Sequence, residues 1–205
     1  MIKKQALKYL GYKEYDASMD ALLDAYLKEL ETYITMKVFY KTFSYQNQCI
    51  KELNIELDSK DAQIYFDGCN RIMVSCATLG MGVERYLRTL QKVDMAKCVI
   101  MDALASAYLE VKLDEYEEFI KEERTYRFAP GYGDLPLNLN RMFYETLNLN
   151  KQLGLTLTET GLFIPQKSML GLIGLGKENK THFCGNCVKY DSCTLRKEGI
   201  SCWKD

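Results

Sequence analysis

The 205-residue chain has little histidine, little proline and almost no net charge. It contains one His, His182, and three Pro, and its 27 Lys and Arg nearly balance its 28 Asp and Glu. A single histidine excludes a His-rich metal site and argues against a catalytic triad built on histidine. Without an excess of clustered Lys and Arg to neutralise phosphates, nucleic acid is not an expected partner.

Long hydrophobic runs are also missing. No window approaches the roughly 20 apolar residues that a membrane span requires. Residues 1–6 carry two lysines, but no apolar block follows them. We therefore expect a cytoplasmic protein with no membrane partner. With 47% apolar and 27% charged residues, the composition is that of a globular chain that buries a core.

The eight cysteines are unevenly distributed. In a reducing compartment they are expected as free thiols or metal ligands rather than disulfides. Four are scattered between positions 49 and 98, and four crowd into the last 22 residues: Cys184, Cys187, Cys193 and Cys202. A Cys-x-x-Cys pair followed by two more cysteines can supply four sulfur ligands to Zn²⁺ or to an iron-sulfur cluster. The alternative is a set of reduced thiols that bind no metal.

The spacing of apolar residues predicts helices alternating with strands. Helices are predicted where apolar residues recur at helical spacing or lie between a cap and a glycine: 18–33, 59–66, 83–90, 94–124 and 139–149. Strands are predicted from alternation or from short apolar runs: 34–43, 50–57, 72–77 and a hairpin within 153–175. Strands in both halves with long helices between them indicate an α+β domain with a mostly antiparallel, twisted sheet.

The residue composition of the chain changes abruptly after Arg124. The stretch RFAPGYGDLP over 127–136 holds two Gly and two Pro within seven positions. Such a loop presents backbone amides and carbonyls in a fixed shape, beside a cation for a carboxylate and an aromatic face for a flat base. It suits a zwitterionic ligand that carries a base. The alternative is a tight turn whose arginine binds a nearby glutamate.

The loop resembles the S-adenosylmethionine (AdoMet) binding motif of the activation domain of cobalamin-dependent methionine synthase. That family pattern is Arg-x-x-x-Gly-Tyr-x-x-x-Pro, which Arg127, Gly131, Tyr132 and Pro136 match. The resemblance covers about residues 61–176, including the strand-to-helix passage at 77–80, a long helix and the 155–159 strand. Residues 1–60 are weakly matched and receive no site assignment.

The resemblance implies roles for five residues. In the family the loop arginine pairs with the carboxylate of AdoMet, the loop alanine and tyrosine contact the adenine side, and a helix glutamate engages the ligand from across the groove. These roles fall on Arg127, Ala129, Tyr132 and Glu110, with Gly131 permitting close approach of the backbone. Glu110 is placed by counting along the helix, and the alternative for it is a solvated carboxylate.

Some features depart from the family. Leu170 stands where a serine is usual, and no aspartate before residue 61 matches the one that contacts AdoMet in the family. After the predicted hairpin, where the family has a second pocket tyrosine, this chain continues into its cysteine cluster.

The resemblance also implies an organisation and a function. Residues 1–176 would form an activation-type AdoMet-binding domain, followed by a Cys-rich tail at 177–205. The chain would act as a stand-alone component of cobalamin-dependent methionine synthase, a methyltransferase of methionine biosynthesis. It would present the methyl group of AdoMet to the cobalt of cobalamin on a separate corrinoid-binding methionine synthase chain, while a reductant such as flavodoxin or ferredoxin supplies an electron. No catalytic side chain is assigned.

Two other functions remain open on the sequence. One is a redox module that holds an iron-sulfur cluster in the tail and passes the reactivating electron. The other is a non-catalytic docking domain for a corrinoid protein, which keeps the fold without AdoMet.

Overall fold

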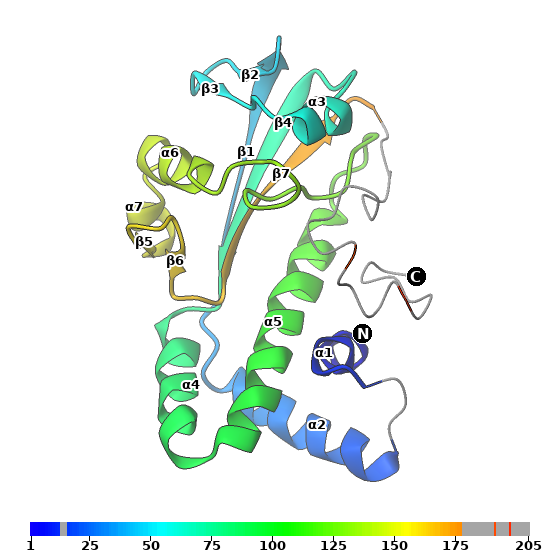
Figure 1. Ribbon diagram of the computed structural model, residues 1–205, viewed down its shortest axis with the longest axis vertical. Helices are drawn as coiled ribbons and strands as arrows, with labels where there is room; N and C mark the ends of the chain where they lie inside the picture. The colour runs from blue at the N-terminus through cyan, green and yellow to red at the C-terminus, as the bar shows by residue number, and fades with distance from the viewer. Residues whose placement is uncertain (13–15, 178–190, 192–196, 198–205) are drawn as a thin grey trace.

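A long helix lies against an antiparallel sheet in the computed structural model, which describes residues 1–12, 16–177, 191 and 197 (Figure 1). The helices are α1 (Ile2–Leu10), α2 (Ala17–Glu31), α3 (Lys60–Tyr65), α4 (Met81–Val93), α5 (Met95–Glu117), α6 (Leu139–Thr146) and α7 (Leu149–Leu153). The strands are β1 (Lys37–Gln46), β2 (Cys49–Ile50), β3 (Ile55–Glu56), β4 (Arg71–Thr78), β5 (Thr156–Leu157), β6 (Phe163–Ile164) and β7 (Ser168–Leu175). None of the described helices is long and apolar enough to cross a bilayer.

The main sheet has the strand order β3-β2-β1-β4-β7, with antiparallel pairing between every two neighbours. β4 pairs along its whole length with β1 on one side and β7 on the other. A strand covered on both faces and both edges is expected to be mostly apolar, and every residue of β4 after Arg71 is buried, including the polar Ser75 and Thr78. The prediction of a buried strand over 72–77 is confirmed, as is the α+β class.

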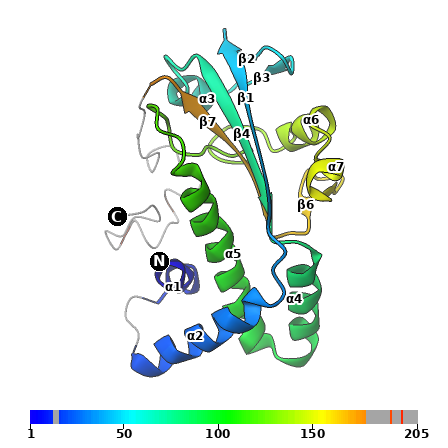
Figure 2. The same ribbon diagram turned by 180° about the vertical axis from the view of Figure 1, so that it is seen from behind.

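The two faces of the sheet belong to different hydrophobic cores. Alternate side chains of β4, such as Ile72 and Val74, pack with α3, α6, α7 and Phe128 in the first core. Ala77, at the end of β4, joins α1, α2, α4 and α5 in the second. Figures 1 and 2 show the consequence: α5 runs along one side of the sheet, while α6, α7 and the β5–β6 pair lie on the other.

Several predicted elements have different limits in the structure. The helix predicted over 139–149 is two helices, because Asn148 adopts a left-handed backbone conformation with φ of 53° and interrupts it. The hairpin predicted within 153–175 is confined to β5 and β6, and the apolar segment after Pro165 instead forms β7 beside β4. The helix predicted to reach 124 ends at Glu117. Helix α1 was not predicted.

The segment just before the 127–136 loop runs along the free edge of β7. Arg124 pairs with Leu175 and Phe128 with Leu172 in antiparallel bridges. Because side chains of extended backbone alternate between faces, Arg127 points toward α5 while Phe128 enters the first core, where its ring stacks on Tyr65 with centroids 4.8 Å apart. The start of the loop is therefore anchored on both sides of the sheet.

Candidate functional site

Arg127 at the start of the loop is bound to two carboxylates of α5. Its Nη1 donates to Glu117 Oε1, and its Nη2 donates to Asp114 Oδ1 at 3.0 Å. The Arg127 side chain is only 11% exposed. Gly171 of β7 makes room for it, since a Cβ at Gly171 would lie 2.2 Å from Arg127 Cγ.

The charge of Arg127 is stabilised within this buried cluster. Burial by itself acts to lower the pKa of Arg127, but Glu117 and Asp114, with a smaller effect from Glu110, raise it above its ordinary value. The guanidinium is therefore charged at neutral pH. Burial raises the pKa of Glu117, and the positive charge of Arg127 opposes that rise. The arginine is thus held by glutamate and aspartate, and a ligand carboxylate at Arg127 stays a prediction.

The other end of the loop is tied to the N-terminus of α3. The Asp134 carboxylate accepts from the backbone N–H groups of Lys60 at 2.9 Å and Asp61 at 3.1 Å. In return, the Asp61 carboxylate accepts from the N–H of Asp134 at 3.1 Å. Burial acts to raise the pKa of Asp134, but hydrogen bonds from Ser59 and from these N–H groups outweigh it and lower that pKa.

Between these anchors, Ala129 and Tyr132 line a cavity of about 390 Å³. Its wall combines the loop with α6, β6 and the start of β7, and includes Asn140, Gln166 and Ser168. Gly131 takes φ of +92°, a left-handed conformation that favours glycine, and its N–H donates to Leu135 O at 2.8 Å. The turn leaves the Tyr132 side chain 44% exposed.

The cavity wall also contains a buried acceptor. Asn140 Nδ2 donates to Gly161 O at 3.0 Å, and Asn140 Oδ1 is buried and accepts no hydrogen bond within the described residues. Apolar side chains such as Leu162 and Met169 complete the wall. Apolar walls with a few polar groups are typical of small-molecule sites.

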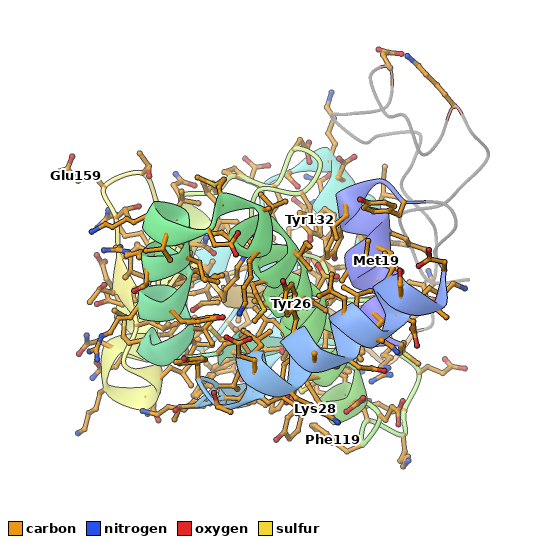
Figure 3. All side chains as sticks on the ribbon, turned by 90° about the horizontal axis from the view of Figure 1, so that it is seen from below. Met19, Tyr26, Lys28, Phe119, Tyr132 and Glu159 are labelled. Atoms are coloured by element: carbon orange, nitrogen blue, oxygen red, sulfur yellow. The ribbon has the colours of Figure 1, made fainter. Side chains whose placement is uncertain are left out.

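Glu110 lines a second cavity, of about 400 Å³, between α1 and α5. Its Oε2 accepts from the Tyr9 hydroxyl, and Gln5 Nε2 lies 3.5 Å away from the same oxygen. Asp102, in the same wall, is bound by Lys167 Nζ at 2.8 Å. The two cavities are near each other: Tyr132 lies next to α1 when the molecule is seen from below (Figure 3), and Tyr132 is close enough to Tyr9 that an ionised Tyr132 would raise the pKa of Tyr9.

The fold therefore brings the predicted residues together in two groups. Ala129, Gly131 and Tyr132 form one wall of the first cavity, and Glu110 belongs to the second. Arg127 lies between α5 and β7, and the negative charge of Glu110 helps to raise the pKa of Arg127. Sequence reasoning missed Gln5 and Tyr9, whose four-residue spacing in a helix places them on one face, because no motif marks α1.

The predicted metal ligands Cys184, Cys187, Cys193 and Cys202 lie outside the described residues. Within residues 1–12 and 16–177 and at 191 and 197, no group of three or more His, Cys, Asp or Glu side chains is arranged to hold a metal ion. The other four cysteines, Cys49, Cys69, Cys76 and Cys98, are free and buried. The interpretation of these four as core thiols is confirmed.

Comparison with known proteins identifies the fold. No family model matches the chain, and no curated protein matches it in sequence. Among solved structures, the MetH reactivation domain bound to AdoHcy superposes with a TM-score of 0.61 at 14% sequence identity, over 93% of this chain and 76% of that one. The chain therefore has the fold of a methionine synthase reactivation domain.

Proposed function

We propose that this chain binds AdoMet and presents its methyl group to a corrinoid cobalt during reactivation of a methionine synthase. The observation that carries the proposal is the loop 127–136. Its residues Ala129 and Tyr132 line a cavity of about 390 Å³, within the roughly 300–1,000 Å³ typical of small-molecule sites. The likeness of the fold to a reactivation domain bound to AdoHcy supports the same ligand class.

The residues around the two cavities fit AdoMet. The exposed face of Tyr132 and the apolar wall suit an adenosyl group, and Asn140 Oδ1 provides a buried acceptor in that wall. The carboxylate of Glu110 suits the cationic amino group of the methionine part of AdoMet. The positive charge of Arg127, near Glu110, suits the carboxylate of that part.

The proposed chemistry asks the protein for binding and alignment rather than proton transfer. The methyl carbon passes from the sulfonium of AdoMet to the reduced cobalt of the partner, the S–CH₃ bond breaks, and AdoHcy remains. A sulfonium is an activated methyl donor, so orientation is the main contribution left to the protein. We propose that the corrinoid is carried by a separate methionine synthase chain and that flavodoxin or ferredoxin supplies the electron.

Calorimetric titration with AdoMet tests the binding part of the proposal. We expect saturable binding that weakens about tenfold in Tyr132→Ala, because an aromatic contact with the adenine is lost. Tyr116→Ala is the matched control, since Tyr116 is similarly exposed on α5 but lines neither cavity. No heat of binding in the wild-type protein, or equal losses in the two variants, would contradict the site.

A reactivation assay tests the rest. A corrinoid methionine synthase lacking its own activation domain, oxidised to the inactive cobalt state, is mixed with AdoMet, reduced flavodoxin and this chain. We expect methyl transfer from isotopically labelled AdoMet to the corrinoid only when this chain is present. AdoMet binding without transfer to any corrinoid partner would contradict the reactivation role, whereas co-purification with a corrinoid protein in the absence of AdoMet binding would favour the docking alternative.

A further inference from the structure

Helix α1 is fixed against α5 beside Glu110. Its apolar residues Ala6 and Leu7 are fully or almost fully buried in the second core, where α5 contributes small residues such as Ala103 and Ala107. In Figures 1 and 2 α1 is seen nearly end-on beside α5. With its apolar face anchored, α1 holds the polar residues Gln5 and Tyr9, one turn apart, near the second cavity.

Gln5 and Tyr9 of α1 both act on a single oxygen of Glu110. The Tyr9 hydroxyl donates to Glu110 Oε2, and Gln5 Nε2 lies 3.0 Å from that hydroxyl and 3.5 Å from the same Oε2. Among the residues that the structure describes, Glu110 Oε1 forms no hydrogen bond and no salt bridge, although Glu110 is close enough to Arg127 to help raise the pKa of that arginine. Burial and the negative charge of Glu110 raise the pKa of Tyr9, so its hydroxyl keeps the proton that it donates.

The two carboxylates in this cavity, Asp102 and Glu110, differ in how their charges are neutralised. Lys167 Nζ neutralises Asp102 and also lies 2.8 Å from Ser106 Oγ. Glu110 meets only neutral donors from α1, and within the described part of the chain no cation lies in salt-bridge contact with it. The cavity of about 400 Å³ therefore offers one oriented carboxylate oxygen to a cation.

We propose that Tyr9 is a positioning residue for the ligand: it fixes the Glu110 carboxylate through Oε2, so that Oε1 receives the ammonium of the amino-acid part of AdoMet. This inference rests on the proposed AdoMet function and deepens it, because it assigns a binding role to α1. Gln5 supports the same arrangement by holding the Tyr9 hydroxyl.

The test compares Tyr9→Phe with Tyr12→Phe by calorimetry, using three ligands. Tyr12 is an exposed tyrosine just beyond α1 that lines neither cavity, so its variant should bind as the wild type does. Tyr9→Phe keeps the ring and removes the hydroxyl. We expect about three- to tenfold weaker binding of AdoMet and AdoHcy, which share the amino-acid part, and unchanged binding of 5′-methylthioadenosine, which lacks it.

A double-mutant cycle separates positioning from packing. In a Glu110→Gln background, where AdoMet binding is already weakened, Tyr9→Phe should add no further loss. Equal weakening for all three ligands, or an additive loss in the Glu110→Gln background, would overturn the inference in favour of a structural role for Tyr9. Wild-type binding of AdoMet that Tyr9→Phe leaves unchanged refutes the inference alone, whereas a wild type that binds none of the ligands refutes the proposed function and the inference together.

Discussion

At the scale of single residues, the site depends on Gly171 and Arg127. The Arg127 side chain fills the space that a side chain at position 171 would occupy. Arg127 reaches Glu117 and Asp114 only because Gly171 has no side chain: an added Cβ would lie 2.2 Å from Cγ and 2.4 Å from Cδ of the arginine. Those atoms belong to the middle of a side chain held at its far end, so they cannot move aside easily. A motif identifies Arg127 in the sequence, but the requirement for Gly171 follows only from β7 lying beside the loop.

We expect Gly171→Ala to lower the free energy of unfolding by about 1–2 kcal/mol, because the crowding outweighs the usual gain of alanine over glycine in a strand. Urea denaturation measures the change. In an Arg127→Ala background the same substitution should be neutral or stabilising, since the obstructing atoms are gone. If Arg127→Ala alone does not fold because it leaves Glu117 buried without its cation, adding Glu117→Gln removes that charge. An equal loss of stability on Gly171→Ala in the wild-type and Arg127→Ala backgrounds would contradict a steric clash between position 171 and Arg127.

At the scale of elements, the loop 127–136 takes its shape from other segments. Phe128 enters the first core, and Asp134 and Asp61 exchange hydrogen bonds with each other's backbone at the start of α3. The sequence predicted a helix over 59–66 that begins at a capping residue, and Ser59 Oγ does accept from Ala62 N at 3.0 Å. It did not predict that Asp134, over seventy residues away, caps the same helix, because such a contact depends on tertiary packing.

We expect Asp134→Ala to reduce stability by about 1 kcal/mol at neutral pH, as the loss of a helix cap does. The native pKa of Asp134 is lowered from its ordinary value of 3.8, so its contribution is present above that value and disappears as the pH falls through the lowered one. The difference between wild type and variant should therefore shrink toward zero under acid. Asp58→Ala, an exposed neighbour, is the control. If the difference in stability between wild type and Asp134→Ala stays constant with pH, the ionised carboxylate of Asp134 is not the group that caps α3.

At the scale of the whole molecule, the central sheet separates two cores and carries the candidate site at its β7 edge. The loop joins the first core through Phe128, and α1 joins the second through Ala6 and Leu7. The loop 127–136 and α1, which are both proposed to help bind the ligand, thus pack against opposite faces of the sheet. The tail cysteines remain a prediction at this scale, since they lie outside the described residues.

We expect an anaerobic preparation to contain one zinc ion or one iron-sulfur cluster per chain, measured by elemental analysis and absorption spectroscopy. Replacing Cys184 and Cys187 with serine should remove the metal, whereas Cys49→Ser, a change at a buried core thiol, should not. Removing the metal with a chelator should leave AdoMet affinity unchanged. A metal-free native protein would exclude both the metal tail and the redox alternative.

The sequence by itself determined the α+β class, the buried central strand, most helices and the motif of the loop, because these follow from local periodicity, capping and turn residues. Tertiary structure alone decided that β7 joins β4 instead of closing a hairpin, that Arg127 is held by α5, and that α1 brings Tyr9 to Glu110. These contacts join segments 10 to about 100 residues apart. Their formation depends on which surfaces are buried together, and that information is absent from local sequence patterns.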